Sequence, residues 1–236
     1  MRWRAVRHRG GAETRGSLVA LWCVLVLLAG CGAGVDQAST PLPPPPSGGS
    51  PVMETIEVGG RPVSVYVPAS RPSSAAALVV ALHGYGGDAA GAVDFFGLRP
   101  LADRRGFVVA APQGTVDRDG KAFWNASRAC CNFWDAAVDD TGHLSRVIAT
   151  VVAQQAIDPD RVYVIGHSNG GFMAHRFACA HPGQVAAIAS LAGALDVVGE
   201  CTPTAPVSVL QVHGDADGTI LFDGGAIDGE PYTSAM

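Results

Sequence analysis

Positive charge is scarce in this sequence. The formal net charge is −5, and Lys121 is the single lysine among 236 residues. An acidic chain argues against a nucleic acid as the partner, because phosphate backbones are bound by clusters of Lys and Arg. Zinc-ligand spacing is also lacking, since no histidine stands beside a cysteine in the pattern of such a site. We therefore expect neither a metal nor another cofactor, and no internal repeat is evident.

Residues 1–30 have the pattern of an export signal. Five arginines precede an apolar run over residues 18–29, which is too short to span a bilayer comfortably. Leu28-Ala29-Gly30-Cys31 then resembles the bacterial lipobox, in which the cysteine becomes the lipidated first residue of the mature protein. We predict a lipoprotein-type signal peptide with lipid attachment at Cys31. An ordinary signal peptide and a membrane-anchoring helix are the alternatives.

A linker is expected over residues 31–51. Four consecutive prolines at 43–46 favour extended polyproline II, and residues 47–50 are flexible Ser and Gly. Removal of residues 1–30 takes away five arginines and one glutamate, which leaves a net charge of −9. Membrane attachment would then depend on the acyl chains at Cys31 and not on basic side chains. Residues 52–236 are expected to form one large α/β domain.

The order of apolar segments predicts the fold. Residues 52–58 and 62–68 alternate around a Gly-Gly turn and indicate a hairpin. Continuous apolar runs predict strands buried on both faces at 75–82, 107–112, 161–165, 185–191 and 207–212. Helices are expected at 90–105 with a break around Pro100, at 144–152 and at 172–178. Alternating strands and helices predict a mainly parallel sheet with helices on both faces.

Four cysteines remain once Cys23 is assigned to the signal peptide and Cys31 to the lipid. In an exported domain they suggest two disulfides, with three connectivities open. A Cys179–Cys201 bond is plausible because both residues flank the strand expected at 185–191. The other two, Cys130 and Cys131, lie in an irregular segment over residues 113–137. Segments of this length are usually functional, so this one is either a pinned structural loop or one wall of a substrate pocket.

The chain is organised around a strand, a tight turn and a helix near residue 168. Gly166-His167-Ser168-Asn169-Gly170 fits the pattern G-x-S-x-G, and an apolar strand precedes it while a helix follows it. In this context the turn forces Ser168 into a strained backbone conformation that exposes its hydroxyl. The two glycines let strand and helix approach without Cβ clashes. We predict that Ser168 is a catalytic nucleophile.

A serine nucleophile needs an acid, a base and donors for the oxyanion. Asp217 follows a strand end downstream, where the acid is expected, and Asp215 competes for that role. Asp139 and Asp140 stand at a helix start, where the helix dipole explains them better than a metal site does. The expected oxyanion donors are the backbone N–H groups of Asn169 and Tyr85.

The base is missing from its expected place, because no histidine follows Asp217. For each histidine of the chain, a structural explanation is preferred to a catalytic one. The histidines are His8, His83, His143, His167, His175, His181 and His213. We therefore expect a C-terminally truncated fragment that lacks a final strand and helix, which would leave an exposed sheet edge. The alternatives are a decayed pseudoenzyme and a substitute base such as His143 or His213.

Five blocks of residues carry a resemblance to a known family. They cover residues 83–87, 138–140, 158–164, 166–171 and 213–217. With them, residues 52–236 resemble the secreted polyhydroxybutyrate depolymerase/feruloyl esterase family of α/β-hydrolases, and the lipobox with its linker is similar to the actinobacterial lipoprotein branch. The resemblance implies Ser168 as nucleophile and Asp217, not Asp215, as acid. It implies esters of short hydroxy acids or of hydroxycinnamates as substrates.

The sequence departs from the family pattern at several places. His143 stands where an aromatic residue is usual, Gly218 where proline is usual, and Tyr85 where cysteine is commoner. The C-terminal Gly-Gly-His-x-Trp block, which carries the base, is absent. The first hypothesis is therefore a lipid-anchored, exported serine esterase that acts on soluble oligomers through an acyl-enzyme on Ser168. The alternatives are an inactive fragment or exported binding protein on the same fold, and an acyltransferase.

Overall fold

The computed structural model describes residues 3–8, 50–72, 74–195 and 201–234. Most of the predicted signal peptide, the lipidation residue Cys31 and most of the linker lie outside these residues. Among the described residues, no helix is long and apolar enough to cross a membrane. The same residues contain no group of three or more His, Cys, Asp or Glu side chains placed to hold a metal ion.

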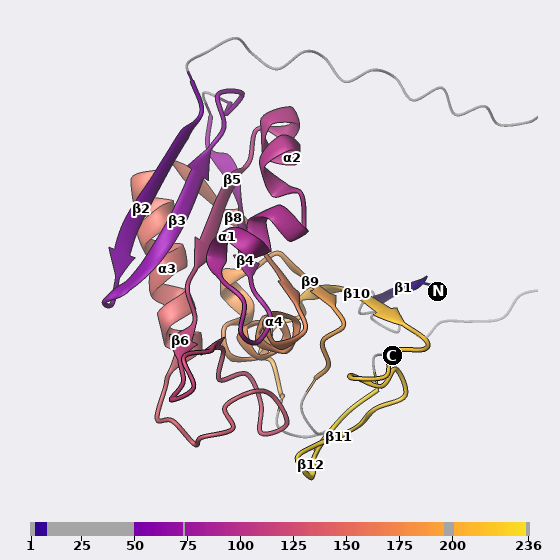
Figure 1. Cartoon of the computed structure of the whole chain (residues 1–236). Helices are drawn as coiled ribbons and strands as arrows, with labels where there is room; N and C mark the ends of the chain where they lie inside the picture. Colours follow the sequence, from indigo (N-terminus) through magenta and orange to yellow (C-terminus); the bar gives the residue numbers. More distant parts are fainter. Residues whose placement is uncertain (1–2, 9–49, 73, 196–200, 235–236) are drawn as a thin grey trace, which may run out of the picture. The chain divides into compact units, whose positions relative to one another are not determined.

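The central sheet of the described chain has eight strands in the order β1-β10-β9-β8-β4-β5-β3-β2 (Figure 1). The strands β10, β9, β8, β4 and β5 run parallel, and the outer strands β1, β3 and β2 are antiparallel to their neighbours. The bounds are β1 Trp3–His8, β2 Val52–Val58, β3 Arg61–Val67, β4 Ala76–Leu82, β5 Val108–Pro112, β8 Ile157–His167, β9 Ala187–Leu191 and β10 Ser208–Gly214. The mainly parallel sheet confirms the predicted fold class.

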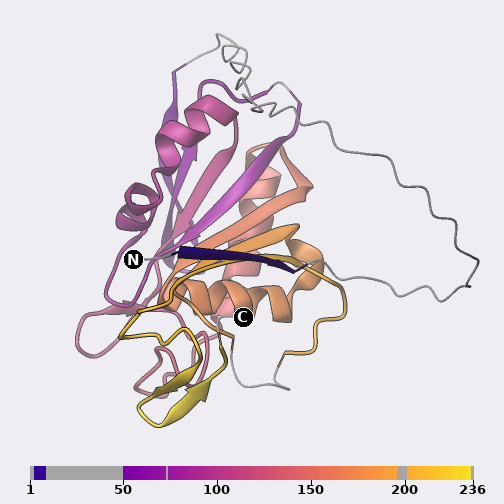
Figure 2. The same cartoon turned by 90° about the vertical axis from the view of Figure 1, so that its right-hand side faces the viewer.

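Helices cover both faces of this sheet (Figure 2). One face carries α1 Ala89–Phe95 and α2 Leu98–Arg105, and the other carries α3 Asp140–Gln154 and α4 Asn169–Ala180. Successive residues of the central strands therefore enter different cores. In β5, Val108 and Ala110 pack in the core that also contains side chains of α3 and α4, while Val109 and Ala111 pack in the core with α1 and α2. Burial on both faces explains why these strands are continuously apolar.

The prediction that the helix at 90–105 breaks around Pro100 is wrong. The chain leaves α1 at Phe96 and turns at Gly97, which has a φ of 60°, in the left-handed region that glycine adopts readily. Pro100 instead lies in the first turn of α2, where a missing N–H costs no helical hydrogen bond. Glycine therefore ends the first helix, and proline is accommodated in the second.

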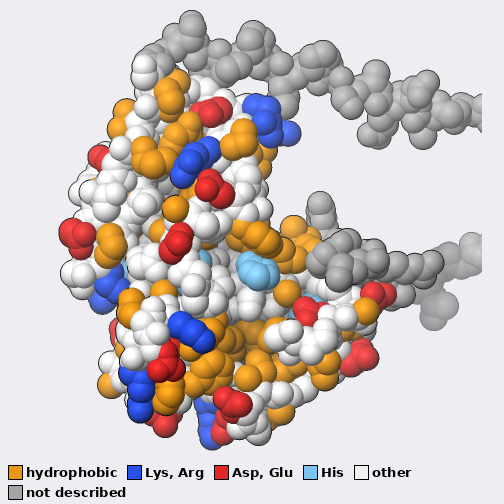
Figure 3. Space-filling view, in the orientation of Figure 1, with side chains coloured by type: hydrophobic (Ala, Val, Ile, Leu, Met, Phe, Trp, Pro, Cys, Tyr) orange, Lys and Arg blue, Asp and Glu red, His pale blue; other side chains and the backbone are white. Residues whose placement is uncertain are grey.

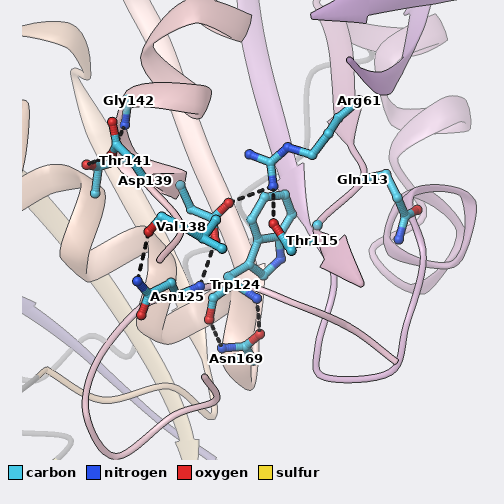
Figure 4. Close-up of polar contacts among 12 residues, drawn as sticks. Arg61, Gln113, Thr115, Trp124, Asn125, Val138, Asp139, Thr141, Gly142 and Asn169 are labelled. Carbon is cyan, nitrogen blue, oxygen red and sulfur yellow. Dashed lines mark hydrogen bonds and ion pairs between the residues drawn. The ribbon is translucent and has the colours of Figure 1, made fainter. Parts of the chain in front are cut away.

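The segment over residues 113–137 is anchored along its length. It contains a short hairpin of β6 Thr115–Val116 and β7 Ala122–Phe123, and Trp124 is fully buried. The Asn125 N–H donates to the Asp140 carboxylate at 2.7 Å, and the Asn125 side chain donates to the Val138 carbonyl at 2.8 Å (Figure 4). These contacts support the interpretation of a pinned structural loop.

Asp140 has a larger role than the helix dipole that explained it from sequence. Its carboxylate is buried and lies 2.6 Å from the guanidinium of Arg61, which comes from β3. The helix is instead capped by Asp139, whose carboxylate accepts the Gly142 N–H at 2.8 Å. Asp140 thus joins the start of α3, the strand β3 and the 113–137 segment through one carboxylate.

The four cysteines among the described residues form two disulfides, Cys130–Cys131 and Cys179–Cys201. The second pair is the one expected from its position around β9. A short 3-10 turn at Pro182–Gln184 follows α4. Near the end of the described chain, β11 Gly225–Ile227 and β12 Glu230–Tyr232 form a separate hairpin.

The sheet edge expected to be exposed is paired in the structure. The strand β1 pairs antiparallel with β10, from Trp3 opposite Gly214 to His8 opposite Val209. This strand lies within the predicted signal peptide. Cleavage at that signal would therefore remove β1 and leave the backbone groups of β10 without this partner.

Candidate active site

Ser168 occupies the turn between β8 and α4 with a φ of 53° and a ψ of −121°. A non-glycine residue in this region is strained, and the surrounding contacts hold it there. The Ser168 N–H donates to the Leu191 carbonyl at 2.8 Å, and the Ser168 carbonyl accepts the Phe172 N–H at 3.0 Å. The backbone therefore has the strained geometry that the G-x-S-x-G pattern predicts.

The two glycines of the turn allow a close approach between backbone segments. A Cβ added at Gly166 would collide with the Gly170 carbonyl, and one added at Gly170 would collide with the Leu82 carbonyl at the end of β4. Both collisions are with backbone atoms, which cannot move aside as a flexible side chain can. The glycines are therefore needed for β8, β4 and α4 to meet beside Ser168.

A cavity of about 310 Å³ opens beside Ser168. Its lining comes from the turn over residues 166–170, which we call the elbow, from the turn after β4 and from α1, and Asp88 is its one charged residue apart from histidines. The lining includes His167, Gly84, Tyr85, Phe95 and Phe96 as well as Ser168. No residue of the 113–137 segment is in this lining, so the alternative of a pocket wall finds no support here. In Figure 3, hydrophobic side chains gather around a hollow in which a histidine is visible.

The sequence predicts a structural role for His167, but its side chain lines this cavity. Its ring packs against Phe95 with centroids 4.7 Å apart. Burial lowers the pKa of His167 below its usual value, and the carboxylate of Asp217 acts in the opposite direction. The position directly before the nucleophile was the available sequence signal for this pocket residue.

The turn after β4 places two peptide units next to the elbow. The His83 Nε2 accepts the Gly114 N–H at 3.0 Å, so the proton is on Nδ1, which donates to the Gly84 carbonyl at 2.8 Å. Burial lowers the pKa of His83, which keeps the ring neutral. The Gly84 carbonyl also accepts the Gly87 N–H at 3.0 Å.

These bonds determine where the Tyr85 N–H points. Because the peptide is planar and trans, the N–H of Tyr85 is directed away from the Gly84 carbonyl. In the described part of the chain this N–H has no hydrogen-bond acceptor. Asn169 is the first residue of α4, so its N–H has no partner within the helix. Both N–H groups expected as oxyanion donors are thus free, and both belong to segments that border the cavity.

Asp217 is held in a tight turn after β10. One carboxylate oxygen accepts the N–H groups of Thr219 and Ile220 at 2.8 and 3.0 Å. The other oxygen lies 3.6 Å from His213 Nε2. Its competitor Asp215 is exposed and has no hydrogen bond or ion pair in the described structure. The geometry favours Asp217 as the fixed carboxylate near the elbow.

Neither alternative base is brought to Ser168. The His213 ring is buried, and its nitrogens contact the Ile220 carbonyl at 2.7 Å and the Gln211 amide at 3.2 Å. His143 is buried in α3 near Arg146 and Gly59. Among the described residues, no histidine makes a hydrogen bond to the Ser168 hydroxyl. Ser168 and Asp217, the predicted nucleophile and acid, are therefore not joined by a histidine among the described contacts.

A second and more apolar cavity of about 290 Å³ lies beside α4. It is lined by Cys179, Cys201 and neighbouring residues of β9 and β10, and Ser168 is not part of it. The chemistry at the elbow therefore points to the first cavity as the candidate active site.

The fold and the elbow define the class of protein as an α/β-hydrolase. The solved structures it resembles include an acetyl xylan esterase from Aspergillus awamori, with a TM-score of 0.51, 21% identity and coverage of 61% of this chain and 53% of that chain. An S-formylglutathione hydrolase from Agrobacterium tumefaciens has a TM-score of 0.50, 19% identity and coverage of 62% and 58%. At these identities the likeness shows the fold alone.

The family model described as Esterase PHB depolymerase matches residues 62–235, so the chain belongs to this family. The protein NocK of Nocardia uniformis subsp. tsuyamanensis, which is named as an esterase, is 33% identical over 89% of this chain and 66% of its own length. The poly(3-hydroxyalkanoate) depolymerase C of Paucimonas lemoignei is 34% identical over 54% and 30%. The feruloyl esterase B of Piromyces equi is 30% identical over 54% and 24%. The predicted family is confirmed, and the chain spans less than two thirds of each of these relatives.

Proposed function

We propose that this chain is the hydrolase part of an exported serine esterase that cleaves carboxylic esters through an acyl-enzyme on Ser168. The observation that carries the proposal is the strained elbow, which presents the Ser168 hydroxyl beside a cavity of about 310 Å³. Membership of the esterase family supports it. A strained non-glycine residue that lines a pocket is typical of a functional site.

In this proposal the Ser168 oxygen attacks the ester carbonyl and the alcohol leaves, which forms an acyl-serine. Water then attacks the acyl group and releases the acid. The N–H groups of Asn169 and Tyr85 stabilise the oxyanion in both steps, where preorganised donors lower the barrier. Asp217 orients the base that receives the serine proton. Since no described histidine is hydrogen-bonded to the Ser168 hydroxyl, this mechanism requires a base from outside the described hydrogen bonds.

The lining of the cavity supports a neutral acyl group. Phe95 and Phe96 supply aromatic surface, and the carboxylate of Asp88 would repel an anion in the cavity. Hydroxyalkanoate oligomers and hydroxycinnamate esters both present a neutral acyl chain at the bond to be cleaved. We propose one of these two ester classes as the substrate, in agreement with the depolymerase and feruloyl esterase names among the relatives.

Hydrolysis of p-nitrophenyl acetate tests the proposal. We expect release of p-nitrophenol by the purified chain, and a loss of at least about 1000-fold in kcat/KM for Ser168→Ala, as expected when a nucleophile is removed. Ser74→Ala is the control, because Ser74 is exposed and remote from the elbow. An equal rate in wild type and Ser168→Ala would contradict the proposal.

The second candidate function is a non-catalytic exported binding protein on the same fold. The observation that favours it is the absence of a histidine hydrogen-bonded to Ser168 in the described structure. This candidate predicts ester binding in the cavity without turnover. Binding of a hydroxycinnamate ester, followed by calorimetry and with no acid released, would support it over the esterase.

We also propose that residues 1–30 are removed during export, that Cys31 carries the lipid anchor and that residues 31–51 form the linker. The support is the order of basic, apolar and Leu-Ala-Gly-Cys segments in the sequence. Such an anchor would keep the esterase at the outer surface of the cell membrane, where an extracellular ester reaches it.

A further inference from the structure

The Asn169 side chain binds a backbone segment far away in the sequence. Asn169 is fully buried; its Oδ1 accepts the Trp124 N–H at 2.7 Å and its Nδ2 donates to the Trp124 carbonyl at 2.9 Å (Figure 4). The amide also lies 3.6 Å from the Cys130 sulfur. Both the oxygen and the nitrogen of the Asn169 side-chain amide are therefore hydrogen-bonded to the backbone of one residue, Trp124, in the 113–137 segment.

Trp124 extends this connection to the other side of the pocket. Its indole N–H donates to the His83 carbonyl at 3.0 Å, and its ring contacts the His83 ring with centroids 5.0 Å apart. Both rings are buried. One tryptophan thus touches the elbow through its backbone and the turn after β4 through its side chain.

The His83 carbonyl and the His83 ring together define the turn that carries Tyr85. The carbonyl belongs to the peptide between His83 and Gly84, and it is held by the Trp124 indole. The next carbonyl, that of Gly84, is held by the His83 ring at 2.8 Å. Two successive peptides are therefore fixed, and the second of them carries the free N–H of Tyr85.

We propose that Asn169 and Trp124 form a positioning unit that sets the two oxyanion donors relative to each other. The N–H of Asn169 lies at one end of the connection and the N–H of Tyr85 at the other. The inference rests on the proposed function, since it assigns both N–H groups to the oxyanion. Neither side chain faces the cavity, so the unit acts through backbone placement and not through contact with the substrate.

The physical reason is that oxyanion donors act by preorganisation. A donor moved by a fraction of an ångström loses much of its effect on the transition state, while it contributes little to binding of the neutral ester. Loss of the unit should therefore lower kcat and leave KM nearly unchanged. A residue that only stabilises the fold would lower the number of active sites, but kcat per active site, counted by titration with a fluorophosphonate, would stay unchanged.

Two variants remove single parts of the unit. Trp124→Phe deletes the indole N–H and keeps a large aromatic side chain, and Asn169→Ala deletes both amide hydrogen bonds. Asn169→Asp keeps the acceptor oxygen and loses the donor, so it replaces Asn169→Ala as the test variant if the alanine variant does not fold. Each should lower kcat for p-nitrophenyl acetate by about 10- to 100-fold, with KM within about threefold. The double variant should lose little more than the worse single variant, because both act in one connection.

Asn132→Ala is the matched control. The Asn132 amide makes the same kind of paired contact within the same segment, since its Nδ2 donates to the Ala136 carbonyl at 2.8 Å and its Oδ1 accepts the Ala136 N–H at 2.9 Å. Asn132 makes no hydrogen bond to His83 or to the elbow, although the ring of its neighbour Phe133 contacts the Tyr85 ring with centroids 5.4 Å apart. The kcat of Asn132→Ala should stay within about twofold of the wild-type kcat. A control that loses as much kcat as Asn169→Ala would overturn the proposal.

A second readout does not depend on catalysis. In ¹⁵N-labelled protein, the amide resonances of Gly84 and Tyr85 should shift in Asn169→Ala and in Trp124→Phe, whereas the Gly84 resonance should keep its wild-type position in Asn132→Ala. Gly84 and Tyr85 resonances that stay at their wild-type positions in Asn169→Ala would overturn the connection. If wild type hydrolyses no ester, the proposed function fails, and the resonances alone then decide whether Asn169 and Trp124 hold the turn.

Discussion

Gly166 and Gly170 are required by the backbone atoms that surround them. A Cβ at either position would meet a carbonyl oxygen of a neighbouring segment, and the strand, the turn and the helix would have to separate. Substitution should therefore act on stability as well as on the nucleophile. These two residues are the clearest case in the molecule where the identity of a side chain follows from the geometry of the backbone.

We expect Gly170→Ala to lower the free energy of unfolding by about 2–4 kcal/mol, because the added methyl overpacks a site with no room. Urea denaturation followed by circular dichroism measures this. Gly183→Ala is the control, since an added Cβ there meets nothing within 4 Å. Equal stability of Gly170→Ala and Gly183→Ala would contradict the close approach at the elbow.

His143 should make the protein less stable in mild acid. Burial, followed by the charges of Arg61 and Arg146, lowers its pKa from 6.5 to about 4, against a smaller opposite effect of Asp139. Between these two values the unfolded chain binds a proton that the folded chain does not. Stability is therefore lost as the pH falls from about 6.5 toward 4, by about 2 kcal/mol at pH 5.

The variant His143→Gln isolates this effect from the other buried histidines. Urea denaturation at pH 7 and pH 5 should show a smaller loss of stability in His143→Gln than in wild type. The same loss in both proteins would show that His143 titrates alike in the folded and unfolded states.

At the level of single residues, the sequence predicted the strained serine, because G-x-S-x-G between a strand and a helix has one known geometry. It did not predict the partners of Asn169 or Asp140. Those partners, Trp124 and Arg61, are 45 and 79 residues away in the sequence. A hydrogen bond between distant residues leaves no local periodicity, and only the packed fold brings the two groups together.

Among the elements, β3 and α3 are joined by the buried ion pair of Arg61 and Asp140. The Asp140 side chain is completely buried and that of Arg61 is 19% exposed. Such a pair is a poor source of net stability, but removal of one partner leaves the other charge uncompensated in the interior.

We expect Arg61→Met to lower the free energy of unfolding by about 3 kcal/mol or more, because the Asp140 carboxylate stays behind without its cation. Thermal or urea denaturation measures the change. Arg128→Met removes the exposed pair with Glu230 and should cost less than about 1 kcal/mol. If both variants lowered the free energy of unfolding by the same small amount, the Arg61–Asp140 pair would have no structural role.

Element types were predictable from sequence, and their ends were less so. The continuous apolar runs gave the buried parallel strands, since only those strands are covered on both faces. The break between α1 and α2 was assigned to Pro100, but proline in a first turn is harmless, and Gly97 makes the turn. The pinned segment over residues 113–137 has no periodicity, so its two alternatives could be separated only by the observed lining of the cavity.

At the scale of the whole molecule, the proposed membrane location depends on lipidation of Cys31. If Cys31 is lipidated, the wild-type protein expressed in a bacterium should fractionate with the membrane, and Cys31→Ala should move it to the soluble exported fraction. Immunoblotting of the two fractions measures this. Cys201→Ala is the control for loss of a cysteine, since Cys201 pairs with Cys179 in the folded domain. Wild-type protein in the soluble fraction would contradict the anchor.

The whole account depends on Ser168 being a reactive nucleophile. The most direct measurement is peptide mass spectrometry of the protein after incubation with a fluorophosphonate. The account predicts one phosphonyl adduct, on the peptide that contains Ser168, and no adduct in Ser168→Ala. A folded wild-type protein that remains unmodified, or carries the adduct equally in Ser168→Ala, would contradict the esterase and favour a binding protein built on the same fold.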